Sequence, residues 1–82
     1  MIGPTRTELL HLLAEDRTTS ELARRLRVSA ATVSAHTAAL RGAGLISTTR
    51  AGKAVLHHRT ALGSLLLGIR PAGPGPAVPN EG

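Results

Sequence analysis

The stretch from Ser20 to Leu45, SELARRLRVSAATVSAHTAALRGAGL, constrains the fold more than any other part of the chain. Side chains that fit one buried helical face recur over a short run and then over a second one. These positions are Leu22, Ala23 and Leu26, followed by Val33, Thr37 and Leu40. Between the runs, Val28 can turn inward and Ser29 can act as an N-cap, so the second helix is predicted to begin at about Ala30. A short helix, a tight turn and a longer helix form a helix-turn-helix, whose second helix lies in the major groove of DNA.

A further helix is predicted ahead of this motif, with Thr5 and Glu8 at capping-box spacing and its end at about Ala14. It carries four leucines: Leu9, Leu12 and Leu13 on one face, with Leu10 beside it. This apolar stripe is wide, so Leu10 belongs either to the core or to a contact with a second subunit.

Local signals mark the ends of the two helices of the motif. Thr18 and Glu21 have capping-box spacing ahead of the first helix. Arg27 occupies a turn position where positive φ is often required, at a cost of about 1 kcal/mol compared with glycine, so either the turn has another geometry or this cost is tolerated. Gly44 is expected to follow the second helix, residues 30–43, in the left-handed conformation.

From Leu45 onward the chain favours β-strands. Two β-tolerant runs, the second ending at Arg59, are separated by Ala51-Gly52, which is a hairpin signal. We expect the hairpin over residues 46–59 to form the wing of a winged helix. Its tip carries Arg50 and Lys53, which can reach phosphates or a minor groove, or which serve solubility alone.

A last helix is predicted from Ala61 to about Gly68, with Thr60 as its N-cap. Its apolar stripe consists of Leu62, Leu65, Leu66 and Ile69. Either a second subunit or the first helix of the same chain is expected to cover this stripe. Residues 70–82, RPAGPGPAVPNEG, are predicted to form a disordered Pro- and Gly-rich tail. The predicted fold of residues 1–69 is therefore mainly α with a small β-hairpin: a winged helix-turn-helix with a three-helix core, a wing and a C-terminal helix.

The residues from Pro4 to Thr60 resemble the winged helix-turn-helix of the arsenical-resistance-repressor (ArsR) family of bacterial transcription regulators. The resemblance is carried by Glu21-Leu22-Ala23, Val28-Ser29, Thr32-Val33-Ser34 with His36, Leu40, and Ala43-Gly44-Leu45. Neighbouring winged-helix families such as the MarR type share several of these pieces. The family usually has Gly or Asn at the position of Arg27 and Leu at the position of Thr37.

The resemblance implies a DNA-binding transcriptional regulator, with Thr32, Ser34 and His36 on the groove side of the recognition helix. Because terminal helices pair two subunits in this family, it also implies a homodimer on a partly symmetric site. A winged helix used for protein contact or dimerisation, without DNA binding, is the alternative. The family usually has a segment ahead of the first helix that this chain lacks, so a fragment of a longer regulator is one interpretation. The operator and the effector stay open.

The charge balance favours a polyanionic partner. Ten Lys and Arg against five Asp and Glu give a formal net charge of +5, and the pI is near 11.7. Double-stranded DNA fits this charge, although an arginine-rich composition also raises the pI without any such partner. With 82 residues, no aromatic side chain and no cysteine, the chain is expected to be one domain of marginal stability that a partner subunit would support.

The predicted DNA-facing surface is poor in polar donors. It comprises Thr19, Ser29, Ala30, Ala31, Thr32, Ser34, Ala35, His36, Arg50 and Lys53. Arg, Lys, Asn and Gln, the usual readers of bases, are missing from the helix face, so modest base discrimination is expected. Small side chains instead let the helix backbone approach phosphate closely. The predicted dimerisation residues are Leu10, Leu62, Leu65, Leu66 and Ile69.

Other classes of function have little support in the sequence. His57 and His58 are adjacent on a strand and should point to opposite faces, while His11 and His36 stand alone, so neither a metal site nor a cofactor is expected. No nucleophile paired with a base, no carboxylate pair and no phosphate-binding glycine loop indicates an enzyme. Polar residues interrupt the N-terminal leucines, and the apolar run over residues 61–69 is far shorter than the roughly 20 residues of a membrane span, so a cytoplasmic protein is expected.

Overall fold

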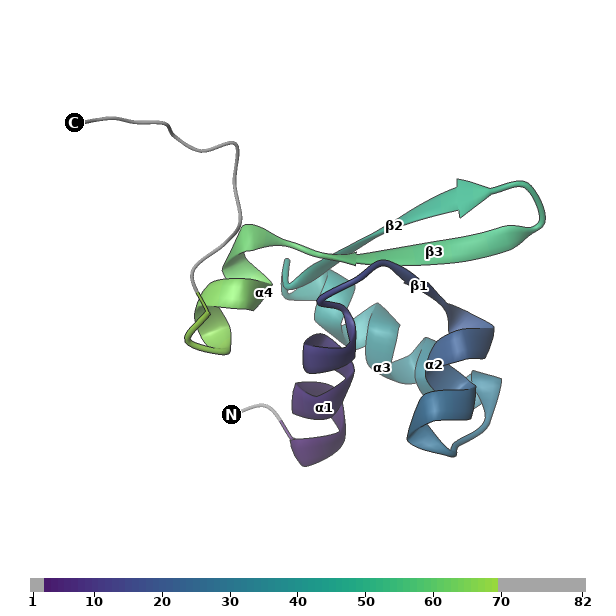
Figure 1. Ribbon diagram of the computed structural model, residues 1–82, viewed down its shortest axis with the longest axis horizontal. Helices are drawn as coiled ribbons and strands as arrows, with labels where there is room; N and C mark the ends of the chain where they lie inside the picture. The colour runs from purple at the N-terminus through teal and green to yellow at the C-terminus, as the bar shows by residue number, and fades with distance from the viewer. Residues whose placement is uncertain (1–2, 70–82) are drawn as a thin grey trace.

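The computed structural model describes residues 3–69 of the 82-residue chain. In chain order its elements are α1 (Pro4–Leu12), β1 (Arg17–Thr18), α2 (Thr19–Leu26), α3 (Ala30–Gly42), β2 (Ile46–Ala51), β3 (Ala54–Arg59) and α4 (Ala61–Leu66). Figure 1 shows three helices below a long hairpin, with α4 at the end of the molecule opposite the hairpin tip. The predicted winged helix-turn-helix is confirmed, whereas the predicted disordered tail lies outside the described residues.

The sheet has three antiparallel strands in the order β1-β3-β2, so the sequence prediction missed one strand. β2 pairs with β3 from Ile46 opposite Arg59 to Ala51 opposite Ala54, which is the predicted hairpin. β1 pairs its two residues with His57 and Leu56 on the other side of β3. Two residues are too few to show the alternation that identifies a strand in a sequence. The short strand fixes the start of α2 against the base of the wing.

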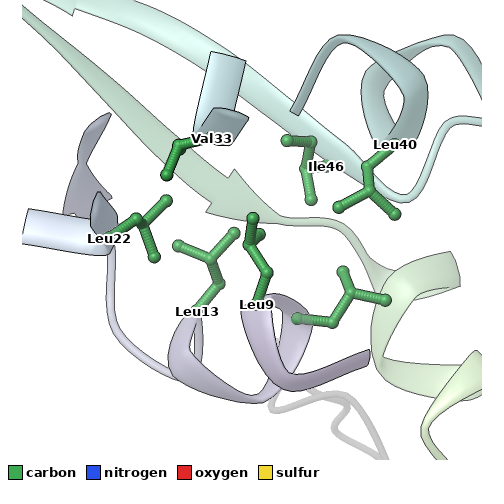
Figure 2. Close-up of a cluster of buried hydrophobic side chains, with 7 residues drawn as sticks. Leu9, Leu13, Leu22, Val33, Leu40 and Ile46 are labelled. Atoms are coloured by element: carbon green, nitrogen blue, oxygen red, sulfur yellow. The ribbon is translucent and has the colours of Figure 1, made fainter. Parts of the chain in front are cut away.

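The core consists of side chains from the three helices and from the start of the hairpin, each at most 2% exposed: Leu9, Leu10, Leu13, Leu22, Val33, Leu40 and Ile46. Figure 2 shows Leu13 facing Leu22 and Leu9 beside Leu13 pointing toward Ile46, with Val33 and Leu40 of α3 above them. α3 is therefore held from one side by aliphatic packing.

Leu10 belongs to this core, which corrects its assignment as a dimerisation residue. Its side chain is 0% exposed, so it offers no surface to a second subunit. The stripe of α1 is wide because the helix is covered on more than one side. Arg59 at the end of β3 donates from Nη1 to the backbone oxygen of Leu10 over 3.0 Å, and Leu67, after α4, also packs on the core.

Three predicted N-caps are present in the structure. Thr18 Oγ1 accepts the backbone N–H of Glu21 over 3.1 Å, and Glu21 Oε1 accepts the backbone N–H of Thr18 over 2.9 Å. The latter hydrogen bond favours the charged carboxylate and lowers the pKa of Glu21. The hydroxyls of Ser29 and Thr60 cap α3 and α4 in the same way. These caps set where α2, α3 and α4 begin.

α1 begins differently from the prediction. Its N-cap is Gly3, no side chain caps it, and Pro4 is its first residue. The predicted capping box of Thr5 and Glu8 is therefore wrong. Proline has no N–H to satisfy and its φ is preset for a helix, so Pro4 can start the helix without a side-chain cap.

The structure describes both departures from the family pattern. Arg27 adopts the left-handed conformation, with φ 60° and ψ 44°, so of the two alternatives the turn keeps the usual geometry and tolerates its cost. Thr37 is buried in place of the usual leucine, and its Oγ1 donates to the backbone oxygen of Ser34 over 3.1 Å. That hydrogen bond satisfies a hydroxyl that would be costly to bury alone. Gly44 has the expected positive φ, 78°.

The position of α4 depends on a close approach at Gly63. A Cβ built on Gly63 would overlap the backbone oxygen of Leu45 and would lie 3.0 Å from Cγ of Arg59. The same backbone oxygen of Leu45 accepts a hydrogen bond from the N–H of Thr60 over 3.1 Å, so it cannot move freely to make room for a side chain. Only glycine lets α4 seat at this distance.

We therefore expect Gly63→Ala to lower the free energy of unfolding by about 1–3 kcal/mol, the usual cost of forcing extra atoms into a packed contact. Gly42→Ala is the matched control, because Gly42 is helical and nothing lies within 4 Å of its added Cβ. Its stability should be unchanged or higher by up to about 1 kcal/mol. Urea unfolding followed by circular dichroism compares the two, and equal stabilities would contradict the close approach.

Candidate nucleic-acid interface

The exposed face of α3 is the centre of the candidate site. Val33, Thr37 and Leu40 are buried, so the helix turns its opposite side to solvent. Of the predicted groove residues of α3, His36 at the border of that side is half-buried, and the others are exposed: Ala30, Ala31, Thr32, Ser34 and Ala35. Except for two hydroxyls, this surface is made of methyl groups and helix backbone.

The start of α3 presents backbone N–H groups that take no part in the hydrogen bonds of the helix. Ser29 Oγ accepts the N–H of Thr32 over 3.1 Å and lies 2.9 Å from its hydroxyl. The N–H of Val33 bonds to the backbone oxygen of Ser29. The N–H groups of Ala30 and Ala31 come before the first helical hydrogen bond and lie at exposed residues. Together with the positive end of the helix dipole, they suit an anion such as phosphate.

The hydroxyl of Thr19, which the sequence predicts to contact DNA, has a partner within the chain. Its Oγ1 is 2.8 Å from Nε2 of His57, which is 2% exposed on the central strand. The other ring nitrogen of His57, Nδ1, lies 3.0 Å from Oγ1 of Thr48 on β2, and Arg41 Nη1 donates to that same oxygen over 3.2 Å. Burial lowers the pKa of His57, and the positive charge of Arg41 lowers it further. The Thr19 hydroxyl therefore joins α2 to the wing.

The sequence interpretation did not identify this cluster. Thr48 lies directly opposite His57 in the hairpin, a register that follows once Ala51 and Ala54 are paired. The hairpin signal could therefore have indicated the contact between Thr48 and His57. Thr19 and Arg41 belong to other elements, α2 and α3, and no local sequence pattern predicts their contacts with this cluster.

The hairpin tip carries two exposed cations, Arg50 and Lys53, around Gly52 with φ 62°. Neither forms an ion pair or a side-chain hydrogen bond with another residue of the described part. A groove of about 260 Å³ separates the tip from the start of α2 and is lined by residues 18–20 and 53–55. Lys53 thus lies near a helix N-terminus, and the two favour an anion between them.

The remaining histidines are separate, as their spacing predicted. His58 lies on the other face of β3 from His57, with Nδ1 2.8 Å from a carboxylate oxygen of Asp16 and Nε2 2.8 Å from Oγ1 of Thr49. Within residues 3–69, no three His, Asp or Glu side chains gather closely enough to hold a metal ion. None of the described helices has the length and apolar character needed to cross a membrane.

Three packed helices, a sheet that ends in a charged hairpin tip and an exposed second helix of the helix-turn-helix define the winged helix-turn-helix class. The sequence over residues 3–48, more than half of the chain, matches the family of bacterial regulatory proteins called the arsR family. The chain belongs to this family, which consists of regulators and not of enzymes.

Solved structures of transcriptional regulators are similar to the chain. They include the zinc-responsive MarR family member ZitR of Lactococcus lactis, at 26% identity and TM-score 0.77 over 83% of this chain and 50% of that one. A mutant of ZitR in complex with DNA matches at 30% identity and TM-score 0.69, over 73% of this chain and 44% of that one. A possible transcriptional regulator for arsenical resistance matches at 29% identity and TM-score 0.71, over 78% and 68%.

The chain spans about half the length of the first of these structures. A comparison with curated protein sequences finds no match.

The buried His57 predicts a pH-dependent stability. Because its pKa is lowered in the folded protein, the unfolded chain takes up the proton first as the pH falls below 6.5, the ordinary histidine value. The free energy of unfolding should therefore be highest above that pH and should decrease below it until the folded histidine also protonates. His57→Gln should remove this part of the pH dependence, whereas His11→Gln, at an exposed position, should retain it. Urea titrations between pH 8 and pH 5 measure the effect, and a wild-type slope in His57→Gln would contradict it.

Proposed function

We propose that this chain is a sequence-specific DNA-binding transcriptional regulator, or the DNA-binding part of one, that works in the cytoplasm. α3 lies in the major groove and the hairpin tip lies on the backbone or in the neighbouring minor groove. The observation that carries the proposal is the exposed face of α3, held by an aliphatic core and accompanied by the exposed cations Arg50 and Lys53 at the hairpin tip. The net charge of +5 and the similarity to ZitR, which has been solved with DNA, support it.

In this proposal, phosphate contacts supply most of the affinity and few contacts read bases. Backbone N–H groups at the start of α3, Arg50 and Lys53 meet phosphates. Alanine methyl groups of α3 face thymine methyl groups, while Thr32 and Ser34 supply hydroxyls that pair with either donors or acceptors. Discrimination between sequences is accordingly modest.

The charge at the wing tip should appear directly in the salt dependence of binding. Arg50→Ala and Lys53→Ala should each reduce the slope of log K against log salt by about one unit, since each releases roughly one fewer counterion. Fluorescence anisotropy with a labelled duplex at several salt concentrations measures this slope. Wild-type binding that does not weaken with salt would contradict the phosphate contacts.

A carboxylate on the exposed face of α3 should weaken DNA binding without unfolding the protein. Ser34→Glu places a negative charge against the DNA, and affinity should fall by about tenfold or more. Ala14→Glu is the matched control, because it adds the same charge at an exposed residue after α1, outside the interface. If both variants bind as the wild type does, α3 does not enter the groove. No duplex affinity in the wild type at low salt would support the alternative of a protein-contact module.

We also propose that the chain forms a homodimer through α4. Leu62, Leu65 and Leu66 are 54%, 60% and 51% exposed, and Ile69 just beyond the helix is 37% exposed. The buried residues of α4 are Gly63 and Ser64, which face the rest of the chain. The leucine stripe therefore stays exposed in the part of the chain that the structure describes. Because α4 lies opposite the hairpin tip, a subunit on this stripe leaves the DNA-facing surface open (Figure 1).

Leu65→Lys should shift the protein from dimer to monomer, because a lysine charge cannot be buried in an apolar contact without a partner. The fold should persist, since Leu65 is exposed in the single chain. Size exclusion with light scattering measures the mass, and Ala14→Lys serves as the control for the added charge. A wild-type protein that stays monomeric at high concentration would contradict the dimer.

A further inference from the structure

One hydrogen bond joins the side chains of α1 and α3 in the described part of the chain. Arg6 Nε donates to Nδ1 of His36 over 3.0 Å, and both residues are half-buried. A guanidinium has donors only, so Nδ1 of His36 must be the acceptor. The neutral imidazole ring then carries its single hydrogen on Nε2. The contact therefore fixes both the orientation of the ring and its tautomer.

The second nitrogen of His36 is left for a partner outside the chain. Within residues 3–69 no group forms a hydrogen bond with Nε2 of His36. The two nitrogens lie on different sides of the ring, so Nε2 is directed away from the α1 side chain that holds Nδ1. His36 lies one turn beyond Thr32 and two residues beyond Ser34, both of which are exposed. The ring thus borders the surface that the proposed function places in the major groove.

We propose that Arg6 is a positioning residue that makes His36 a donor-only reader of one base edge, an inference that rests on the proposed DNA binding. A donor Nε2–H pairs with an acceptor of the major groove; cytosine presents only its amino group there, and adenine presents N7 beside an amino group that repels a donor. Thymine presents one acceptor, O4, beside its methyl group, whereas guanine presents two, N7 and O6, and no donor. The expected preference at the position under His36 is therefore guanine, on a helix face that is otherwise poor in base readers.

The tautomer can be measured without DNA and without any substitution. Long-range nitrogen-15 correlation spectra of the wild-type protein, recorded well above the ordinary histidine pKa of about 6.5, distinguish a protonated ring nitrogen from an unprotonated one. We expect the hydrogen of His36 on Nε2. In Arg6→Met, which keeps an unbranched apolar stem but has no donor, the spectrum should change to a mixture of both tautomers. Arg25→Met removes the same charge from an exposed position of α2 and should leave the His36 spectrum unchanged.

The effect on base reading is measured by selection from a pool of randomised duplexes, followed by affinity measurements on single-base variants of the selected site. Wild type and Arg25→Met should prefer guanine at one position by about three- to tenfold, as expected for one hydrogen bond to a base. Arg6→Met should lose this preference while it keeps the remaining base profile. Arg6→Met and Arg25→Met should have similar salt slopes, because neither arginine is among the phosphate contacts of the proposed function.

The outcomes separate this inference from the proposed function. A hydrogen on Nδ1 of His36 in the wild type, or an unchanged guanine preference in Arg6→Met, overturns the role of Arg6 and leaves DNA binding intact. A wild-type protein with no affinity for any duplex overturns the proposed function and base reading with it. Loss of the guanine preference in Arg25→Met as well would assign the effect to charge and would also overturn the positioning role.

Discussion

One-sided burial of α3 is the constraint on which the rest of this structure depends. Val33 and Leu40 pack against leucines of α1 and α2, and each fully buried side chain of this kind contributes roughly 1.5–3 kcal/mol compared with exposure to water. A surface ion pair such as that between Arg17 and Glu15 contributes under about 1 kcal/mol. Aliphatic packing therefore decides which face of α3 turns outward.

A second set of contacts relates the wing to the helices. His57 on β3 lies between hydroxyls of Thr19 and Thr48, and Arg41 at the end of α3 donates to Thr48. Through one buried ring, the start of α2, the base of the hairpin and the end of α3 are held together. A polar group this deeply buried is tolerated because both of its nitrogens have partners. The charged tip of the wing is thereby carried at a defined position relative to α3.

The small side chains of α3 have one advantage and one disadvantage for DNA binding. Alanine favours the helix and allows the backbone to come close to a DNA surface, but it cannot distinguish most bases. The few polar groups that remain on or beside this face therefore have to be oriented accurately. The hydrogen bond from Arg6 meets this requirement for His36, because it holds the imidazole ring in one orientation.

The four helices, the caps at Thr18, Ser29 and Thr60 and the hairpin around Gly52 could all be predicted from the amino-acid sequence. Each of these depends on residues at most a few positions apart, where spacing and side-chain chemistry act directly. The folded structure was needed to place Leu10 in the core and to pair Thr19 with His57. The same holds for the contact of Arg6 with His36, which lies 30 residues away in sequence. Such pairings depend on how whole elements pack, and the periodicity of a single helix or strand carries no information about them.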